Sequence, residues 1–350
     1  MDNKKLKSLI SSAGVPRLII GGFFLVLLFS AIPLGMDIQG LLTNLLTRVG
    51  MNGILVLAMV PGIRSGIGLN FGIAVGIVGG IVGGLISIEL GLHGWTALLV
   101  AILIGVSLAA VMGYLYGVLL NRVKGSEMSV STYVGFSIIS LMNIAWLVLP
   151  FKSTAIRWPI GVGLRNTVSL QESSGVVLTE FLSFTIGKVV VPTGALLLLA
   201  LCCFVMYLFL NSRLGIAMSA AGSNPRFAQA NGINVDKMRL LGTTVSTATA
   251  AVGIIAYAQC FGFIQLYTAP LMMSFAAVAA VLIGGASLSH AKVTHVIIGV
   301  ILFQGIISMG LPIANRIIPE GNLSEVIRLI ISNGIILYSL TKAKGGRANA

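Results

Sequence analysis

The chain has 350 residues, of which 57% are hydrophobic and only 9% are charged, and its mean hydropathy is +1.03. A soluble domain carries about 25% charged residues, so this composition excludes a soluble globular protein and indicates a polytopic membrane protein. The net charge of +13 does not indicate nucleic-acid binding, because the basic residues are spread between apolar segments without an aromatic platform.

Apolar segments recur along the whole chain. A membrane-spanning helix needs about 20 apolar residues, or somewhat fewer when it is packed inside protein. Ten segments qualify, near 18–35, 45–63, 67–90, 96–121, 129–150, 189–210, 240–262, 271–288, 293–311 and 326–341. The sequence therefore predicts an all-α polytopic membrane protein with about ten transmembrane helices. A tail at 1–17 precedes the transmembrane domain at 18–341, and a second tail follows at 342–350.

The basic residues predict how these segments are oriented. If the N-terminus lies inside the cell, 15 of the 22 Lys and Arg residues fall on the cytoplasmic side, and most acidic residues fall outside. This distribution favours an N-in, C-in topology, with an outer loop at 151–188 and a cytoplasmic loop at 211–239. Residues 36–48 are too polar for a span, and they predict an interfacial helix on the outer face.

Glycine is abundant, with 43 residues, and Gly72, Gly76, Gly80 and Gly84 recur at every fourth position. Small residues at this spacing let membrane helices approach closely, so we expect packing between helices there. A segment interrupted by Gly or Pro and followed by a helix of small residues occurs at 61–84 and again at 269–288. Such a pairing suggests an inverted repeat of two halves.

Motifs for chemistry are missing from the sequence. It contains no Gly-x-x-x-x-Gly-Lys-[Ser/Thr] phosphate-binding loop, no Gly-x-Ser-x-Gly nucleophile motif and no metal-ligand spacing. The three cysteines, Cys202, Cys203 and Cys260, lie in apolar segments and form no disulfide framework. We therefore expect no catalytic residue, no metal site and no cofactor in this chain.

The spans do contain uncharged polar side chains. Each of these residues is more simply explained by hydrogen bonds between helices, but together they suit a pathway for a neutral, polar solute. No acid or base lies squarely in mid-span, which argues against a carrier driven by protons or sodium ions. The candidate pathway residues are Asn70, Asn52, Tyr133, Gln259, Gln265 and Ser274.

The stretch 220–239 is the longest in the middle of the chain that cannot lie in hydrocarbon. Asn224 is suited to capping the start of a helix, Pro225 to its first position and Gly232 to a left-handed stop. About two helical turns fit between them. The sequence thus predicts a short helix exposed outside the bilayer, which is either a docking surface or a plain cytoplasmic loop.

The run Gly222-Ser-Asn-Pro-Arg-Phe-Ala-Gln-Ala-Asn-Gly-Ile-Asn-Val235 resembles the cytoplasmic loop of permeases from binding-protein-dependent ABC importers. The closest likeness is to the ribose and simple-sugar permease family, which includes nucleoside permeases. A second matching run is Val278-Ala-Ala-Val-Leu-Ile-Gly-Gly-Ala-Ser-Leu288. The two runs cover roughly the C-terminal third, whereas 61–72 lacks the Gly-Gly-Ile-Asp-Leu-Ser-Val-Gly pattern of the family.

The resemblance implies a permease subunit of the cell (plasma or inner) membrane that imports a small polar solute, most simply a ribose-like sugar, or alternatively a nucleoside. A second permease chain, identical or related, would complete the pathway, and an extracytoplasmic binding protein would deliver the solute. ATP and Mg would be bound by a separate ATPase subunit. The residues expected to couple this chain to the ATPase are Gly222, Asn224, Pro225, Arg226, Phe227, Ala228, Gly232 and Ile233.

Within that loop, Phe227, Ala228 and Ile233 are expected to be apolar anchors in a groove of the ATPase. Arg226, Lys237 and Arg239 are expected to be rim charges or lipid-facing anchors. A protein of another class, an ATP-independent secondary carrier or channel, would explain the glycine-rich spans equally well. It would not explain the capped cytoplasmic helix.

Overall fold

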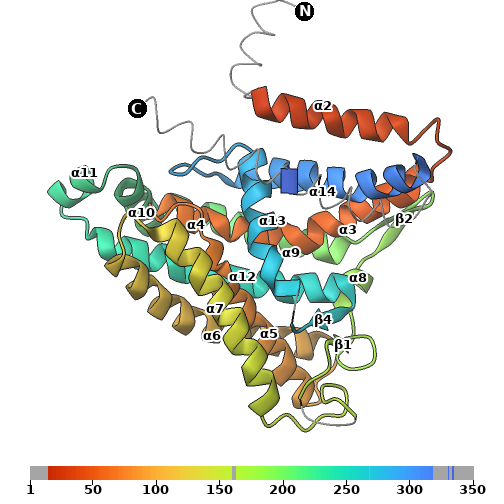
Figure 1. Ribbon diagram of the computed structural model, residues 1–350, viewed down its shortest axis with the longest axis horizontal. Coiled ribbons are helices and arrows are strands. Elements are labelled where there is room, and N and C mark those ends of the chain that lie inside the picture. The colour runs from red at the N-terminus through yellow and green to blue at the C-terminus, as the bar shows by residue number, and fades with distance from the viewer. Residues whose placement is uncertain (1–14, 160–162, 268, 318–329, 331–332, 335–350) are drawn as a thin grey trace, which may run out of the picture.

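The computed structural model shows a bundle of long helices (Figure 1) and describes residues 15–159, 163–267, 269–317, 330 and 333–334. The tail at 342–350 and most of the tail at 1–17 lie outside these residues, as does nearly all of the predicted tenth span at 326–341. The described helices are α2 (Val15–Ser30), α3 (Ile38–Leu57), α4 (Met59–Arg64), the 3₁₀ helix η1 (Phe71–Ile73), α5 (Ala74–Glu89), α6 (Gly94–Arg122), α7 (Glu127–Val148), α8 (Val177–Glu180), α9 (Thr193–Asn211), α10 (Arg213–Ser223), α11 (Pro225–Ala230), α12 (Val235–Phe261), α13 (Ala269–Ile283) and α14 (Val293–Ile317).

Seven helical segments of the described chain are long and apolar enough to cross a membrane. They are formed by α3 with α4, η1 with α5, α6, α7, α9, α12 and α14, while α2 and α13 are shorter apolar helices. Each of the first nine predicted segments overlaps one of these helices. The predicted all-α polytopic architecture is thus confirmed.

The prediction of a separate interfacial helix at 36–48 is wrong. The Asp37 carboxylate accepts a hydrogen bond of 3.1 Å from the Gln39 amide and caps α3, which then runs without a break into the membrane-spanning part. A β-hairpin contacts the polar first turns of α3, with the Val190 amide donating to the Thr43 hydroxyl at 3.0 Å. The polar residues therefore extend the span instead of forming an element of their own.

The outer loop at 151–188 takes part in two small antiparallel sheets that the sequence did not predict. Strand β1 (Thr167–Ser169) pairs with β4 (Phe263–Gln265), so that Val168 lies opposite Ile264. Strands β2 (Phe184–Ile186) and β3 (Val189–Val191) form the hairpin beside α3. The β1–β4 pair joins the loop to the segment between α12 and α13.

Glycine-rich α5 lies at the centre, packed against α6 and α12. A Cβ atom on Gly76 would collide with the Thr247 carbonyl of α12. About two turns further along α5, a Cβ atom on Gly83 would lie 2.5 Å from the Ala101 carbonyl oxygen of α6. The repeat of small residues therefore brings three helix backbones together, as the sequence predicted.

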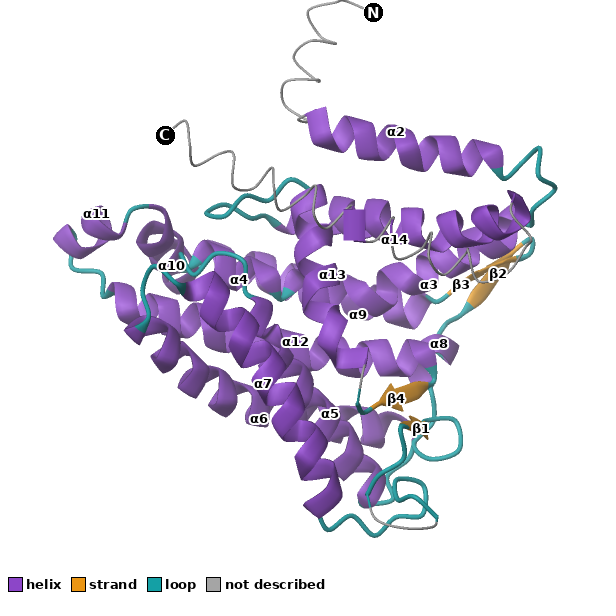
Figure 2. Cartoon of the chain, in the orientation of Figure 1, coloured by secondary structure: helices purple, strands orange, loops and turns teal. Residues whose placement is uncertain are grey.

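The connecting segments gather at two opposite ends of the bundle (Figure 2). At one end, the Arg64 guanidinium donates to the Ala291 carbonyl at 2.7 Å, next to α10 and α11. At the other end, the Glu89 carboxylate accepts from the Lys152 and Ser153 amides at the start of the outer loop, at 2.9 and 3.0 Å. This alternation matches the predicted order of inner and outer segments.

The helix contacts favour the suggested inverted repeat. Helix α12 packs on α3, α5 and α6, and α3 in turn packs on α12, α13 and α14. Exchanging α3, α5 and α6 for α12, α13 and α14 thus maps one set of neighbours onto the other. The first turns of α5 and α13 lie beside one another, since Ala74 lines the same small cavity as Leu271 and Ser274.

Candidate functional site

The predicted short helix is present as α11, and its boundaries follow from local chemistry. The Asn224 side-chain oxygen accepts a hydrogen bond of 3.0 Å from the Phe227 amide, and Pro225 occupies the first helical position. Gly232 ends the turn with a φ of +78°, a left-handed conformation that L side chains rarely adopt. Sequence analysis located this element correctly.

The three predicted apolar anchors differ in exposure. Phe227 is 62% exposed at the tip of the loop, whereas Ala228 is completely buried. Ala228 packs with Ala221 and Val235, and Ile233 lies against the same small cluster. The expectation of a partner contact is therefore wrong for Ala228, which fixes α11 to its own chain, and Phe227 is the exposed apolar side chain of the three.

Helix α10 rests directly on the non-helical stretch between α4 and α5. A Cβ atom on Gly222 would lie 2.6 Å from the Gly66 amide nitrogen, so the glycine permits contact between the two backbones. The Arg64 guanidinium also donates to the Ser219 hydroxyl at 3.0 Å. Beside it, partial burial and the charges of Arg64 and Lys292 lower the pKa of His290.

Arg239 is not a rim or lipid-facing charge as the sequence suggested. It is only 8% exposed, and its guanidinium donates to the Glu127 carboxylate at 2.7 Å. Glu127 begins α7, where an acid also meets the positive end of the helix dipole. Spacing could not have revealed this pair because the two residues are 112 positions apart.

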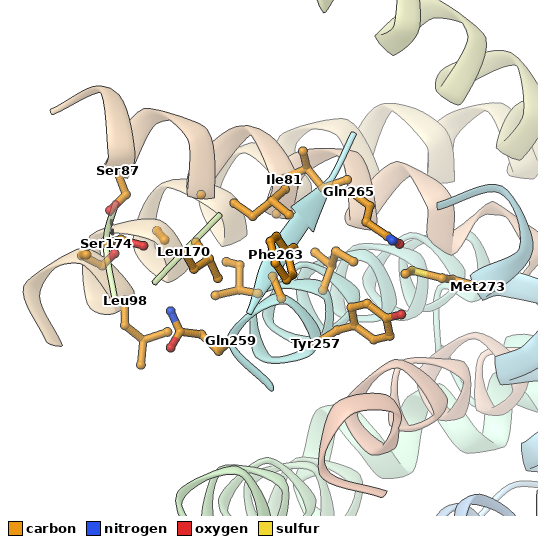
Figure 3. A pocket seen from close by; sticks show the side chains of 18 residues that line it. Ile81, Ser87, Leu98, Leu170, Ser174, Tyr257, Gln259, Phe263, Gln265 and Met273 are labelled. Atoms are coloured by element: carbon orange, nitrogen blue, oxygen red, sulfur yellow. Dashed lines mark hydrogen bonds between the residues drawn. The ribbon is translucent and has the colours of Figure 1, made fainter. Parts of the chain in front are cut away.

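Two of the candidate pathway residues, Gln259 and Gln265, line the same cavity between α5, α6, α12 and β4. Figure 3 shows Leu170 and Phe263 in its middle, with Ser87 and Ser174 toward one end. The cavity volume of about 30 Å³ suffices for a water molecule or two, because one water needs roughly 10–15 Å³ by this measure. In this conformation it is too small for a sugar.

Gln259 connects the outer loop to α12. Its side-chain nitrogen donates to the Gly175 carbonyl at 3.0 Å, and its oxygen accepts from the Leu178 amide at 3.4 Å. Movement of the outer loop would therefore act directly on one wall of the cavity.

Asn70 lies elsewhere, at the centre of a buried hydrogen-bond network. Its side-chain oxygen accepts from the Tyr116 hydroxyl at 2.8 Å and from the Gly72 amide at 3.1 Å. Its nitrogen donates to the Ser246 hydroxyl at 3.1 Å, which donates in turn to the Ala58 carbonyl at 2.7 Å. The network connects the non-helical stretch at 65–70, between α4 and α5, to α6 and α12.

The remaining three candidates are scattered. The Asn52 amide donates to the Arg48 carbonyl within α3 at 3.0 Å, and the side chain is half-buried. Tyr133 is 70% exposed on α7. Ser274, on α13, is buried with no hydrogen-bond partner among the described residues, and it lines a second small cavity beside Phe275. The structure thus brings together two of the six residues and leaves the other four apart.

Sequence analysis missed the partners of these residues. Tyr116, Ser246, Asn121 and Glu127 contact candidate residues only because distant helices pack together. Their spacing along the chain carries no signal of these contacts, although an amide, hydroxyl or carboxylate inside a membrane protein needs a partner.

The fold defines a multi-pass membrane protein with a short capped helix exposed at one end. Comparison with known families is more specific. Residues 41–337 match the family described as branched-chain amino acid transport system / permease component. The chain therefore belongs to this family of ABC-type transport permeases, proteins of the plasma membrane that work with an ATPase and are not themselves catalytic. Searches of curated proteins and of solved structures found no match.

Proposed function

We propose that this chain is the permease subunit of an ABC importer and that α11 is the element that docks on the ATPase. The observation that supports this proposal is the exposure of Phe227 on a capped helix. The buried Ala228 fixes this helix to the bundle. An apolar anchor on a short rigid helix suits docking into a groove. Movement of this helix by ATP-driven closure of the ATPase would open and close the pathway.

The solute that we propose is a simple sugar, with ribose as the representative. Support comes from the two sequence runs that resemble simple-sugar permeases and from the amide and hydroxyl groups of Gln259, Gln265 and Ser274 at the described cavities. Such groups bind a neutral hydroxylated molecule by hydrogen bonds. The alternative is that the same importer takes up a nucleoside. The family description favours a branched-chain amino acid as a third.

A second permease chain would complete the pathway, and a binding protein would deliver the solute to the outer loop. Several large apolar side chains of α7 are exposed, including Leu141, Ile144 and Val148, which suits contact with lipid or with a second chain. The outer loop at 151–188 carries Trp158, which is 53% exposed, and reaches Gln259 at the cavity. A protein bound there would be well placed to act on the cavity.

The first experiment is a mild detergent purification of the tagged chain from its native membrane, followed by intact-mass analysis of the assembly. We expect an ATPase and two permease chains. If the chain is recovered without an ATPase in several detergents, the importer proposal is wrong, and an ATP-independent carrier or channel takes its place.

The solute is tested in cells that lack this chain. Uptake of radiolabelled ribose, of a nucleoside and of leucine is compared with that of cells in which the chain is restored. We expect ribose uptake to depend on the chain. If only nucleoside uptake or only leucine uptake depends on the chain, the proposal of a sugar is wrong. The proposal of an importer is then unaffected.

A further inference from the structure

The loop containing α11 is rigidly joined to the first turn of α12. Four residues separate the two helices, and the Asn234 side chain caps α12 by accepting from the Lys237 amide at 3.0 Å. The buried cluster of Ala221, Ala228 and Val235 joins α10, α11 and α12. Any displacement of α11 therefore displaces the start of α12.

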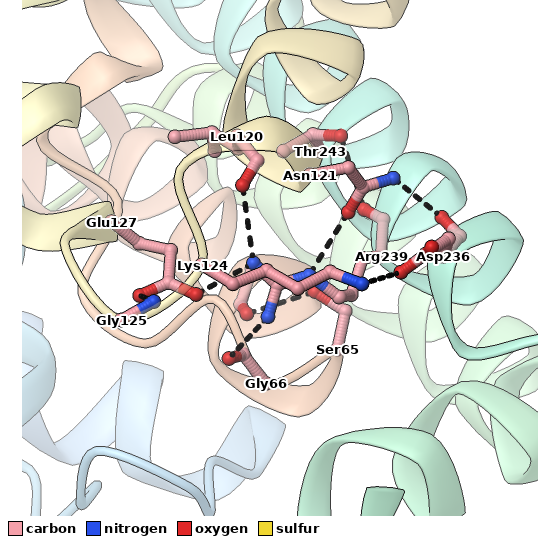
Figure 4. Close-up of polar contacts among 11 residues, drawn as sticks. Ser65, Gly66, Leu120, Asn121, Lys124, Gly125, Glu127, Asp236, Arg239 and Thr243 are labelled. Atoms are coloured by element: carbon pink, nitrogen blue, oxygen red, sulfur yellow. Dashed lines mark hydrogen bonds and ion pairs between the residues drawn. The ribbon is translucent and has the colours of Figure 1, made fainter. Parts of the chain in front are cut away.

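Arg239 follows directly after that first turn, and its guanidinium contacts three other segments (Figure 4). It donates to the Asn121 side chain at 3.0 Å and to the Leu120 carbonyl at 3.4 Å, both near the end of α6. It donates to Glu127 at the start of α7 at 2.7 Å, and to the Gly66 carbonyl between α4 and α5 at 3.4 Å. All three guanidinium nitrogens are used.

The ion pair is largely removed from water. The Arg239 side chain is 9% exposed and the Glu127 side chain is 14% exposed. A buried ion pair is a poor way to gain stability, because apolar side chains of similar volume often stabilise as well or better, but it fixes geometry. An arginine also holds several acceptors in one planar arrangement, which a lysine cannot do.

We propose that Arg239 is a positioning residue that transmits the displacement of α11 to the ends of α6 and α7. This inference rests on the proposed function, since it takes the ATPase as the source of the displacement. When α11 moves, the guanidinium carries Asn121 and Glu127 with it. The α6–α7 turn and the stretch at 65–70 then shift together.

The same interface offers a matched control. Lys124 and Asp236 form a second ion pair, at 2.5 Å, between the α6–α7 turn and the first turn of α12. Their side chains are 51% and 55% exposed, so solvent screens the pair and it transmits little force. Breaking this pair removes one contact between the same segments and leaves Arg239 in place.

The test is hydrogen–deuterium exchange of the purified complex with and without ATP and orthovanadate, which needs no knowledge of the solute. In the wild type we expect nucleotide-dependent changes in deuterium uptake at 211–239 and at 120–130. In Arg239→Lys the change at 120–130 is expected to fall about five-fold, while the change at 211–239 is kept. Glu127→Gln, which preserves side-chain shape, is expected to act in the same way, and Lys124→Gln is expected to behave like the wild type.

Each outcome decides between the roles. If Arg239 has only a structural role, Arg239→Lys raises deuterium uptake at 120–130 equally with and without nucleotide. The difference between the two nucleotide states is then unchanged. If the difference at 120–130 is unchanged in both Arg239→Lys and Glu127→Gln, or if Lys124→Gln abolishes it too, the inference is overturned. A wild-type complex with no change at 211–239 would instead contradict the proposed function.

Discussion

At the scale of single residues, Asn70 shows how a polar group inside a membrane protein is satisfied. Its side-chain amide forms hydrogen bonds with the Tyr116 hydroxyl, the Ser246 hydroxyl and the Gly72 backbone amide, and the residue is completely buried. A buried polar group that loses its partner costs about 1–3 kcal/mol. In this conformation, Asn70 acts as a support for the break between α4 and α5.

We predict that Asn70→Ala destabilises the protein by about 2–4 kcal/mol, because it leaves several buried groups without a partner. The measurement is the thermal unfolding of the detergent-solubilised chain. Asn52→Ala is the control and should have little effect, because the Asn52 amide bonds within its own helix. If Asn70→Ala unfolds at the wild-type temperature but abolishes uptake, Asn70 is a pathway residue instead.

The sequence identified Asn70 as a polar residue of interest but could not predict its surroundings. Tyr116 is 46 positions away and Ser246 is 176 positions away, and only the packing of α6 and α12 brings them together. The same reason made Arg239 resemble a surface charge, since its neighbours in sequence say nothing about Glu127, which is 112 positions away. Partners across helices depend on tertiary contacts that spacing does not encode.

At the scale of elements, α11 is a helix of six residues, too short to be stable by itself. The Asn224 cap, which binds the backbone amide of Phe227, and the burial of Ala228 hold it in place, and neither uses the Phe227 side chain. The helix can therefore lose the phenylalanine side chain without losing its structure.

We predict that Phe227→Asp reduces co-purification of the ATPase at least about ten-fold, because a central apolar anchor contributes a few kcal/mol to docking. The chain itself should be recovered in wild-type amount and unfold at the same temperature. Gln229→Asp places the same charge on an exposed neighbouring position of α11 and is expected to retain the ATPase. Retention of the ATPase by Phe227→Asp at the wild-type level would exclude the anchor role.

Element boundaries were predictable where a local signal sets them. Asn224 and Gly232 delimit α11 through a side-chain cap and a positive φ, both of which are properties of the residues themselves. A helix was predicted at 36–48, but its continuity with the following span was missed, because no local signal marks where the polar part of α3 meets the apolar part. The pairing of β1 with β4 joins segments about 100 residues apart and had no signal in the sequence.

At the scale of the whole molecule, the close packing of α5 against α6 and α12 organises the bundle. Without water between helices, membrane proteins gain stability from close contact of small residues. The recurrence of glycine at every fourth position predicted such contact. It could not predict that Gly76 contacts Thr247 of α12 or that Gly83 contacts Ala101 of α6.

We predict that Gly76→Val prevents stable folding, because its side chain would collide with the α12 backbone and overpacking costs about 1–3 kcal/mol or more. The measurement is the yield of monodisperse chain on size-exclusion chromatography. Gly22→Val in α2 is the control, since nothing in the described chain lies within 4 Å of the added Cβ. An equal yield from both variants would contradict the central role of this contact.

The cysteines have a practical consequence for mapping the two faces of the membrane. Cys202 and Cys203 lie in α9 and Cys260 lies in α12, so no thiol of the sequence falls in a connecting segment. A membrane-impermeant maleimide applied to sealed vesicles would therefore report a single introduced cysteine without a background from either surface. Asn231→Cys and Ser183→Cys lie at opposite ends, and their labelling from opposite sides of the vesicle would reveal the orientation of the chain chemically.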